Sequence, residues 1–175
     1  MEQYFRTYLY RDVARLFPRL DTSRFLLFLQ LLAGLAGDVV NDSEVARGHL
    51  RDSGLLHHLL RIPDLEALLG HPRHGLSWEG MVIEEFNRQL VCTGEPFEAY
   101  YYRTSAGAEV DLVLEGDFGL VPIEIKRGSA VDPRNLRGIR DFVAERSCRF
   151  GIVVNNDTAP RLYDERLVGV PFVFL

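Results

Sequence analysis

The segment VPIEIK, residues 121–126, combines an acid and an amine on one expected strand in a way that suits hydrolytic chemistry. Lys126 is the only lysine among the 20 lysine and arginine residues of the chain. Side chains alternate between the two faces of a strand, so Glu124 and Lys126 point to the same side. A compact ammonium there orients and polarises a water molecule and neutralises charge in a phosphorane-like transition state. The wider guanidinium of arginine does this less well.

A second acid, Asp111, interrupts the apolar series of the preceding expected strand, AEVDLVLE at residues 108–115. If a hairpin pairs the two strands, Asp111 and Glu124 lie on strands about 4.8 Å apart. Two ionised carboxylates side by side repel each other, and a divalent cation that prefers oxygen ligands removes the repulsion. The pattern therefore predicts a metal-dependent site with Asp111, Glu124 and Lys126 as catalytic residues. The alternative is that these are ordinary strand-face residues whose cross-strand pairs contribute little.

A third acid comes from the helix expected to start at Ser77, with the sequence SWEGMVIEEFNRQLV. At about 100° per residue, Glu79 falls inside the apolar arc that contains Trp78 and Val82. A carboxylate among core-facing positions is costly unless a charged group meets it. We therefore expect Glu79 to contribute a third carboxylate to the site.

The elements that must position these residues fall into two regions that meet near residue 70. Residues 1–70 have leucine-rich helical periodicity, with helices expected over 4–16 and over 23–36, the latter capped by Ser23. Residues 77–175 are expected to hold the Ser77 helix, three strands (FEAYYYR, AEVDLVLE and LVPIEIK), a helix with Asp132 as its N-cap and Pro133 at its first position, and two final strands (RFGIVVNN and VPFVFL). The expected fold class is α/β, with a mixed sheet preceded by a small helical region.

The charge balance argues against a protein that holds nucleic acid by charge alone. The net charge is −5 at pH 7, with a sequence pI near 5.5. Residues 77–175 carry 11 basic and 16 acidic side chains, so the whole excess lies in the second region. Contact with a polyanion would then require a divalent cation to reverse the local sign of the charge.

The remaining composition predicts a cytoplasmic protein with no membrane partner. Cys92 and Cys148 fit no zinc spacing and are expected to be reduced thiols. The histidines at 57–58 and at 71 and 74 have no partner set for a metal site, so we expect them to have surface or packing roles. No apolar run is long enough to cross a bilayer, and the N-terminus has no signal-peptide centre.

With Glu79 on a helix, Asp111 on a strand and Glu124-x-Lys126 on the next strand, the second region resembles the PD-(D/E)XK nuclease superfamily. The resemblance implies a restriction-endonuclease-like α-β-β-β-α-β core. It also implies that Glu79, Asp111 and Glu124 ligate Mg²⁺ or Mn²⁺ and that Lys126 assists the attacking water. One departure is that Val110, not proline, precedes Asp111.

Motifs along nearly the whole chain, among them YFRTYLYRDVARLF, LLAGLAGDVVNDSEVA, SWEGMVIEEF and PIEIKRG, resemble an uncharacterised domain family. That family forms the C-terminal part of bacterial and archaeal P-loop ATPases of the AAA type. In it an arginine-rich helix and a winged helix precede the nuclease-like domain. Residues 1–70 would be the remnant of those parts, with the winged helix truncated because Gly48 directly follows SEVAR. No G-x-x-x-x-G-K-[ST] motif occurs, so no ATP site is expected in this chain.

Two functions follow as hypotheses. The first is a metal-dependent nuclease that hydrolyses phosphodiester bonds in DNA with a metal-activated water, with Arg103 and Arg127 contacting phosphate. Both arginines are also consistent with simple solubility. The second is a catalytically inert accessory or oligomerisation module, in which the N-terminal helices dock on a second copy or on an ATPase partner. Nucleic-acid binding without chemistry is a third idea, which the acidic balance disfavours.

Overall fold

A computed structural model of the chain describes residues 7–18, 20–35, 52–104 and 107–175. The chain folds into two units, Met1–Met81 and Val82–Leu175, and the boundary falls inside helix α6 (His74–Thr93). Within the described ranges, no helix combines the length and the apolar character needed to span a membrane.

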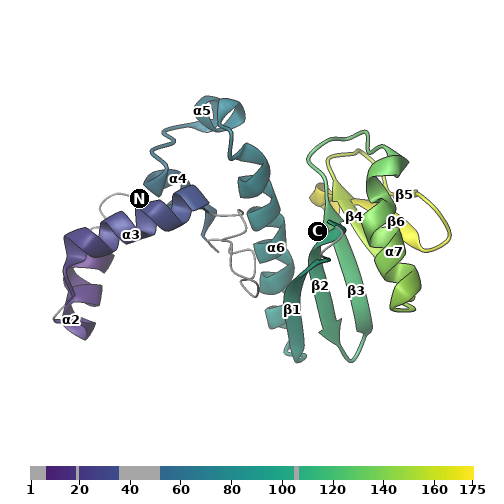
Figure 1. The fold of residues 1–175 in the computed structure, drawn as a ribbon, viewed down its shortest axis with the longest axis horizontal. Coiled ribbons are helices and arrows are strands. Elements are labelled where there is room, and N and C mark those ends of the chain that lie inside the picture. Colours follow the sequence, from purple (N-terminus) through teal and green to yellow (C-terminus); the bar gives the residue numbers. More distant parts are fainter. Residues whose placement is uncertain (1–6, 19, 36–51, 105–106) are drawn as a thin grey trace. The chain divides into compact units, whose positions relative to one another are not determined.

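The first unit is helical, as the leucine periodicity predicts. It holds a π-helical segment η1 (Tyr8–Val13), the single turn α2 (Ala14–Leu16), α3 (Thr22–Leu35), α4 (Ser53–Leu59), α5 (Leu65–Gly70) and the start of α6 (Figure 1). Buried apolar residues from η1, α3 and α4 form its core: Leu9, Val13, Ala33, Leu56 and Leu59. The truncated winged helix expected around SEVAR and Gly48 falls mainly on residues 36–51, outside the described ranges.

Two helix starts differ from the sequence prediction. Asp21, not Ser23, caps α3, because its Oδ1 accepts hydrogen bonds from the amides of Ser23 (3.0 Å) and Arg24 (3.1 Å). Helix α6 begins at His74, so Ser77 is inside the first turns rather than at the N-cap. Ser77 is 5% exposed and its Oγ lies 2.6 Å from Nε2 of His57, so this hydroxyl joins α6 to α4.

The second unit contains a six-stranded mixed sheet in the order β1-β2-β3-β4-β6-β5. The strands are β1 (Phe97–Arg103), β2 (Glu109–Gly116), β3 (Gly119–Ile125), β4 (Gly151–Asn155), β5 (Arg161–Leu162) and β6 (Leu167–Pro171). Strands β1, β2 and β3 are antiparallel neighbours, whereas β3, β4 and β6 run parallel. The expected mixed α/β architecture is confirmed, with the short β5 as an additional strand. The final strand expected at VPFVFL is wrong in its bounds, because β6 ends at Pro171 and the chain continues as a 3₁₀ segment.

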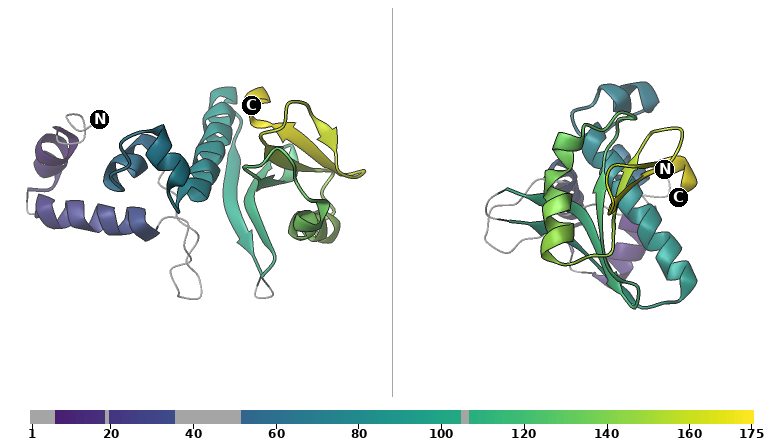
Figure 2. Two further views of the ribbon diagram at one scale, coloured as in Figure 1. Left: turned by 90° about the horizontal axis from the view of Figure 1, so that it is seen from above. Right: turned by 90° about the vertical axis from the view of Figure 1, so that its right-hand side faces the viewer.

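Helix α7 (Arg137–Glu145) covers one face of this sheet, and the part of α6 from Val82 onward lies on the other face (Figure 2). The 3₁₀ segment η2 (Pro133–Leu136) leads into α7, and η3 (Phe172–Phe174) ends the chain. The buried cluster under α7 contains Val110, Val113, Leu136, Ile139, Phe142, Val143, Cys148, Val153 and Leu167. Gly138 allows the close approach of α7, because a Cβ there would lie 2.8 Å from the carbonyl oxygen of Glu109.

Strand β2 departs from the strict alternation that its sequence predicts. Tyr100 pairs with Val113, but Tyr102 pairs with Val110, so two β2 residues stand opposite one residue of β1. This β-bulge falls at Asp111 and Leu112, and it explains why Val110 and Val113 both enter the cluster under α7. Bulges of this kind re-aim side chains at the point where pairing is interrupted.

The β2–β3 hairpin is confirmed, with Gly116 paired to Gly119 across the turn. Gly119 has a φ of 88°, which favours glycine and completes the turn. Pro122 lies in β3 before the parallel pairing with β4 begins at Ile123, so its missing N–H does not interrupt that ladder.

Candidate functional site

Asp111 and Glu124 meet where β2 and β3 stop pairing. The last ladder pair of the two strands is Leu112 with Ile123, so Asp111 and Glu124 are the next positions along each strand. The ladder is then continued by a side chain, because Oδ2 of Asp111 accepts a hydrogen bond from the amide of Ile125 at 2.8 Å. The bulge thus directs the Asp111 carboxylate toward the end of β3.

Glu124 and Lys126 are brought into direct contact at this strand end. Oε1 of Glu124 lies 2.5 Å from Nζ of Lys126. Glu124 is buried, with 7% of its surface exposed, whereas the side chain of Lys126 is one-third exposed. Because a buried carboxylate is costly without a compensating charge, the adjacent ammonium offsets part of the cost of burying Glu124.

A pocket of about 440 Å³ opens beside Glu124. Its walls come from the start of β2, the end of β3 and the N-terminal part of η2 and α7, through Gly107, Ala108, Glu109, Glu124, Asn135, Arg137, Gly138 and Asp141. Three carboxylates and one guanidinium line it, so it is a predominantly acidic pocket of the kind that attracts cations. The sequence reasoning missed Asn135, Arg137 and Asp141 as lining residues. The sequence does place these residues near the site, because the helix that starts at Asp132 and Pro133 follows shortly after the strand that leads to Lys126.

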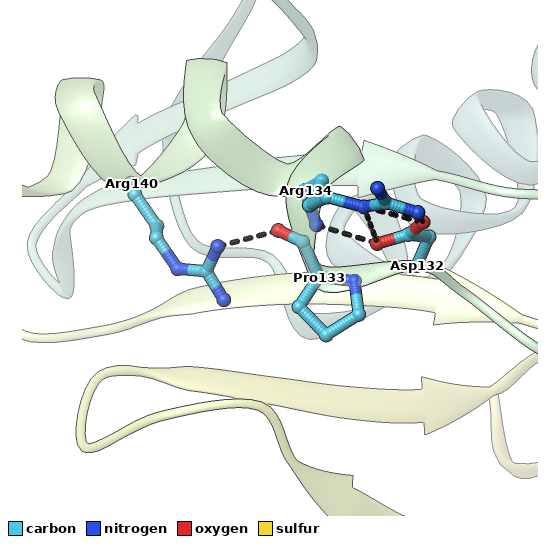
Figure 3. A network of polar contacts seen from close by, with 4 residues as sticks. All are labelled: Asp132, Pro133, Arg134 and Arg140. Carbon is cyan, nitrogen blue, oxygen red and sulfur yellow. Dashed lines mark hydrogen bonds and ion pairs between the residues drawn. The ribbon is translucent and has the colours of Figure 1, made fainter.

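A polar network fixes the segment that forms the pocket wall (Figure 3). Asp132 accepts hydrogen bonds from the amide and the guanidinium of Arg134, at 2.9 and 2.7 Å, and these bonds lower the pKa of Asp132. Arg140 donates to the carbonyl oxygen of Pro133 at 2.5 Å and to Asp164 at 2.7 Å. Burial alone would raise the pKa of Asp164, but hydrogen bonds led by that of Arg140 lower it overall. The cap expected from Asp132 and Pro133 is therefore confirmed.

The two arginines proposed for phosphate contact lie on either side of the strand ends. Nε of Arg103, on β1, is 3.1 Å from Oε1 of Glu109, which lines the pocket. Arg127 follows Lys126 directly and is exposed. Their contact with phosphate stays a prediction.

Glu79 belongs to the first unit, on the N-terminal half of α6, and is partly buried. Asp111, Glu124 and Lys126 belong to the second unit. The participation of Glu79 in the site stays a prediction.

Within the described part of the chain, no group of three His, Cys, Asp or Glu side chains is arranged to hold a metal ion. A pair of carboxylates nevertheless suits Mg²⁺, which is usually bound through one or two carboxylates together with water and substrate phosphates. Asp111 and Glu124, with their hard oxygen atoms at adjoining strand ends, fit that donor set. They do not fit the nitrogen and sulfur ligands of a closed structural zinc site.

Two mycobacterial proteins are similar to this chain. It is 39% identical over 124 residues to "Uncharacterized protein Mb2031c" of Mycobacterium bovis and, equally, to "Uncharacterized protein Rv2008c" of Mycobacterium tuberculosis. The aligned part is 70% of this chain and 26% of each relative, so the chain spans about a quarter of the length of these proteins. No solved structure matches the chain.

A family model described as "Domain of unknown function (DUF4143)" matches residues 74–173, which include α6, the whole sheet and the strand ends described above. This domain is often found in proteins associated with AAA ATPases. The match confirms the expected relation to an uncharacterised domain family, while the nuclease-like core stays a prediction. The chain therefore belongs to the DUF4143 family.

Proposed function

We propose that residues 77–175 form a restriction-endonuclease-like domain of the PD-(D/E)XK type, which hydrolyses phosphodiester bonds in DNA with Mg²⁺ or Mn²⁺. The observation that carries this proposal is the meeting of Asp111, Glu124 and Lys126 at one strand end. Asp111 bonds to the amide between the other two residues, and Glu124 bonds to Lys126. The order of elements, α6-β1-β2-β3-α7-β4, supports it as well.

Each side chain has a definite task in this proposal. Asp111 and Glu124 would hold the divalent cation. A bound Mg²⁺ or Mn²⁺ would polarise a phosphate oxygen and lower the pKa of water. Lys126 holds its ammonium beside the carboxylates, where it orients a water molecule and stabilises negative charge that develops on the phosphate.

The charges of the second unit make this function depend on the cation. DNA meets an acidic pocket lined by Glu109, Glu124 and Asp141, which repels phosphate. A divalent cation bound by Asp111 and Glu124 would reverse the local sign of the charge, and Arg103 and Arg127 are placed to contact neighbouring phosphates. DNA binding at this site is therefore expected only when Mg²⁺ or Mn²⁺ is present.

The test is cleavage of supercoiled and linear DNA with Mg²⁺ or Mn²⁺ by the unaltered chain and by Asp111→Asn and Lys126→Ala. Loss of a group that stabilises the transition state typically costs about 10²- to 10³-fold in rate, and we expect a loss of this size in both variants. Asp117→Asn is the matched control, because Asp117 is an exposed acid in the turn of the same hairpin. The proposal fails if the chain does not cut DNA, or if cutting persists unchanged in both variants.

A second candidate is an inert accessory or oligomerisation module. It is favoured by large apolar side chains on the first unit that are more than half exposed: Leu16, Phe17, Leu27 and Phe28. Such surface is typical of a docking site for a second copy or for an ATPase partner. Light scattering on the chain and on Leu27→Glu separates the two cases. An oligomer that dissociates in the variant, together with no DNA cleavage, would favour the module.

A further inference from the structure

Lys126 stands just beyond the regular part of β3, where few ladder bonds remain to hold it. The pairing with β2 ends at Ile123, and the pairing with β4 ends at Ile125, opposite Val154. One backbone bond continues past this point, from the amide of Lys126 to the carbonyl oxygen of Val154 at 2.8 Å. A catalytic ammonium at such a strand end requires an additional constraint if it is to keep a fixed position.

Asn156, the first residue after β4, supplies that constraint. Its side-chain amide donates a hydrogen bond to the carbonyl oxygen of Arg127 at 2.9 Å. Its backbone amide approaches the carbonyl oxygen of Gly128 at 3.4 Å. Both contacts hold the chain directly after Lys126, on the side opposite to the bond that Asp111 makes before it.

Asn155, the residue before Asn156, is held in place by burial and hydrogen bonds. Asn155 is fully buried, and its side chain donates to the hydroxyl of Tyr163 at 3.0 Å and accepts from the amide of Asp157 at 3.0 Å. Asn156 is exposed and has no part in the buried cluster under α7. Its side chain thus anchors the segment after Lys126 through a hydrogen bond and contributes little to the buried core.

We propose that Asn156 is a positioning residue for Lys126. It fixes the peptide groups that follow Lys126, and this in turn fixes the direction in which the lysine side chain extends toward Glu124. The catalytic meaning of this inference rests on the proposed nuclease function, but the positioning itself does not. A displacement of about 1 Å in a catalytic group can cost up to about 10²-fold in rate, so the loss of such a clamp is measurable.

The single lysine gives a direct test. The full chain is labelled with ¹³C and ¹⁵N lysine, so that one set of lysine side-chain signals reports on Lys126 alone. In the unaltered protein and in the control Thr158→Ala, an exposed change in the same loop, we expect a high order parameter for the ε-methylene and a through-space contact with the γ-protons of Glu124. In Asn156→Ala we expect the contact to weaken and the ε-methylene to become mobile. The amide spectrum of the sheet should stay intact.

Cleavage kinetics supply the second readout. If the chain cuts DNA, Asn156→Ala should lower kcat by about tenfold and leave KM nearly unchanged, with kcat calculated per folded molecule from the folded fraction that the sheet spectrum gives. A mobile Lys126 in a chain that cuts no DNA supports the positioning role and refutes the nuclease. An unchanged lysine signal in Asn156→Ala, or a collapse of the whole sheet spectrum, overturns the inference whatever the activity.

Discussion

Replacing Lys126 with methionine tests how strongly the buried Glu124 depends on its partner. The substitution keeps the length and most of the volume of the side chain but removes the ammonium that lies 2.5 Å from Glu124. Removing one partner of a fully buried pair costs about 3–5 kcal/mol, whereas exposed pairs contribute about 0.2–1 kcal/mol. Because Glu124 is buried and Lys126 is one-third exposed, we expect an intermediate loss of about 2 kcal/mol.

The assay is urea unfolding of the unaltered chain, Lys126→Met, Glu124→Gln and the double variant. The methyl signals of Val153 and Ile123 serve as probes, because both residues are buried in the sheet of the second unit and report on its unfolding. The double variant should be less destabilised than the sum of the single ones, with a coupling of about 1–2 kcal/mol. Saturating Mg²⁺ should stabilise Lys126→Met, because the cation would compensate the buried carboxylate in place of the ammonium.

Two results would refute this reasoning. If the free energy of unfolding of Lys126→Met lies within about 0.5 kcal/mol of that of the unaltered chain, the Glu124–Lys126 pair contributes no more than an exposed ion pair. If the two single effects simply add, Glu124 and Lys126 do not stabilise each other.

Substitutions at three other positions give distinct expectations. Asp111→Asn should keep the hydrogen bond from the amide of Ile125 but lose affinity for divalent cations, which calorimetric titration measures. Asp111→Ala should lose both, and its free energy of unfolding in urea should fall by about 1–3 kcal/mol. Gly138→Ala should destabilise the chain by about 1–3 kcal/mol despite the better helix propensity of alanine, because the new Cβ would lie 2.8 Å from backbone of β2; a higher thermal midpoint would contradict this. Burial and a hydrogen bond to Glu115 raise the pKa of Tyr100 from 10.0 to about 12. The neutral hydroxyl therefore stabilises the fold fully below pH 10, and this contribution is lost as the pH rises toward about 12. Tyr100→Phe should remove this part of the alkaline destabilisation and one ultraviolet titration step; an unchanged alkaline profile would contradict it.

The sequence predicts the framework of the second unit because its signals are local. The hairpin between β2 and β3 follows from two apolar runs separated by turn residues, and Gly119 supplies the positive φ that the turn requires. The start of the α7 segment follows from Asp132 and Pro133, whose capping geometry depends only on neighbouring residues. The approach of Glu124 and Lys126 follows from the period of two in a strand.

The features that the sequence did not predict depend on contacts between distant segments. The bulge in β2 is set by its pairing with β1 and by the demand that Val110 and Val113 both pack under α7, which no local pattern reveals. Serine is a common N-cap residue, but α6 begins at His74, so Ser77 lies inside the helix, where its hydroxyl contacts His57 of α4. The same limit applies to Asn156, whose role depends on the alignment of two loops far apart in the sequence.

The central claim is that Asp111 and Glu124 hold a divalent cation next to Lys126. The most direct measurement is titration of the lysine-labelled chain with Mn²⁺, which is paramagnetic and broadens the signals of nearby nuclei. We expect the single lysine signal to broaden below one equivalent of Mn²⁺, excess Mg²⁺ to restore it, and Asp111→Asn to abolish the effect. A lysine signal that stays sharp at one equivalent of Mn²⁺, or that broadens equally in Asp111→Asn, would contradict it.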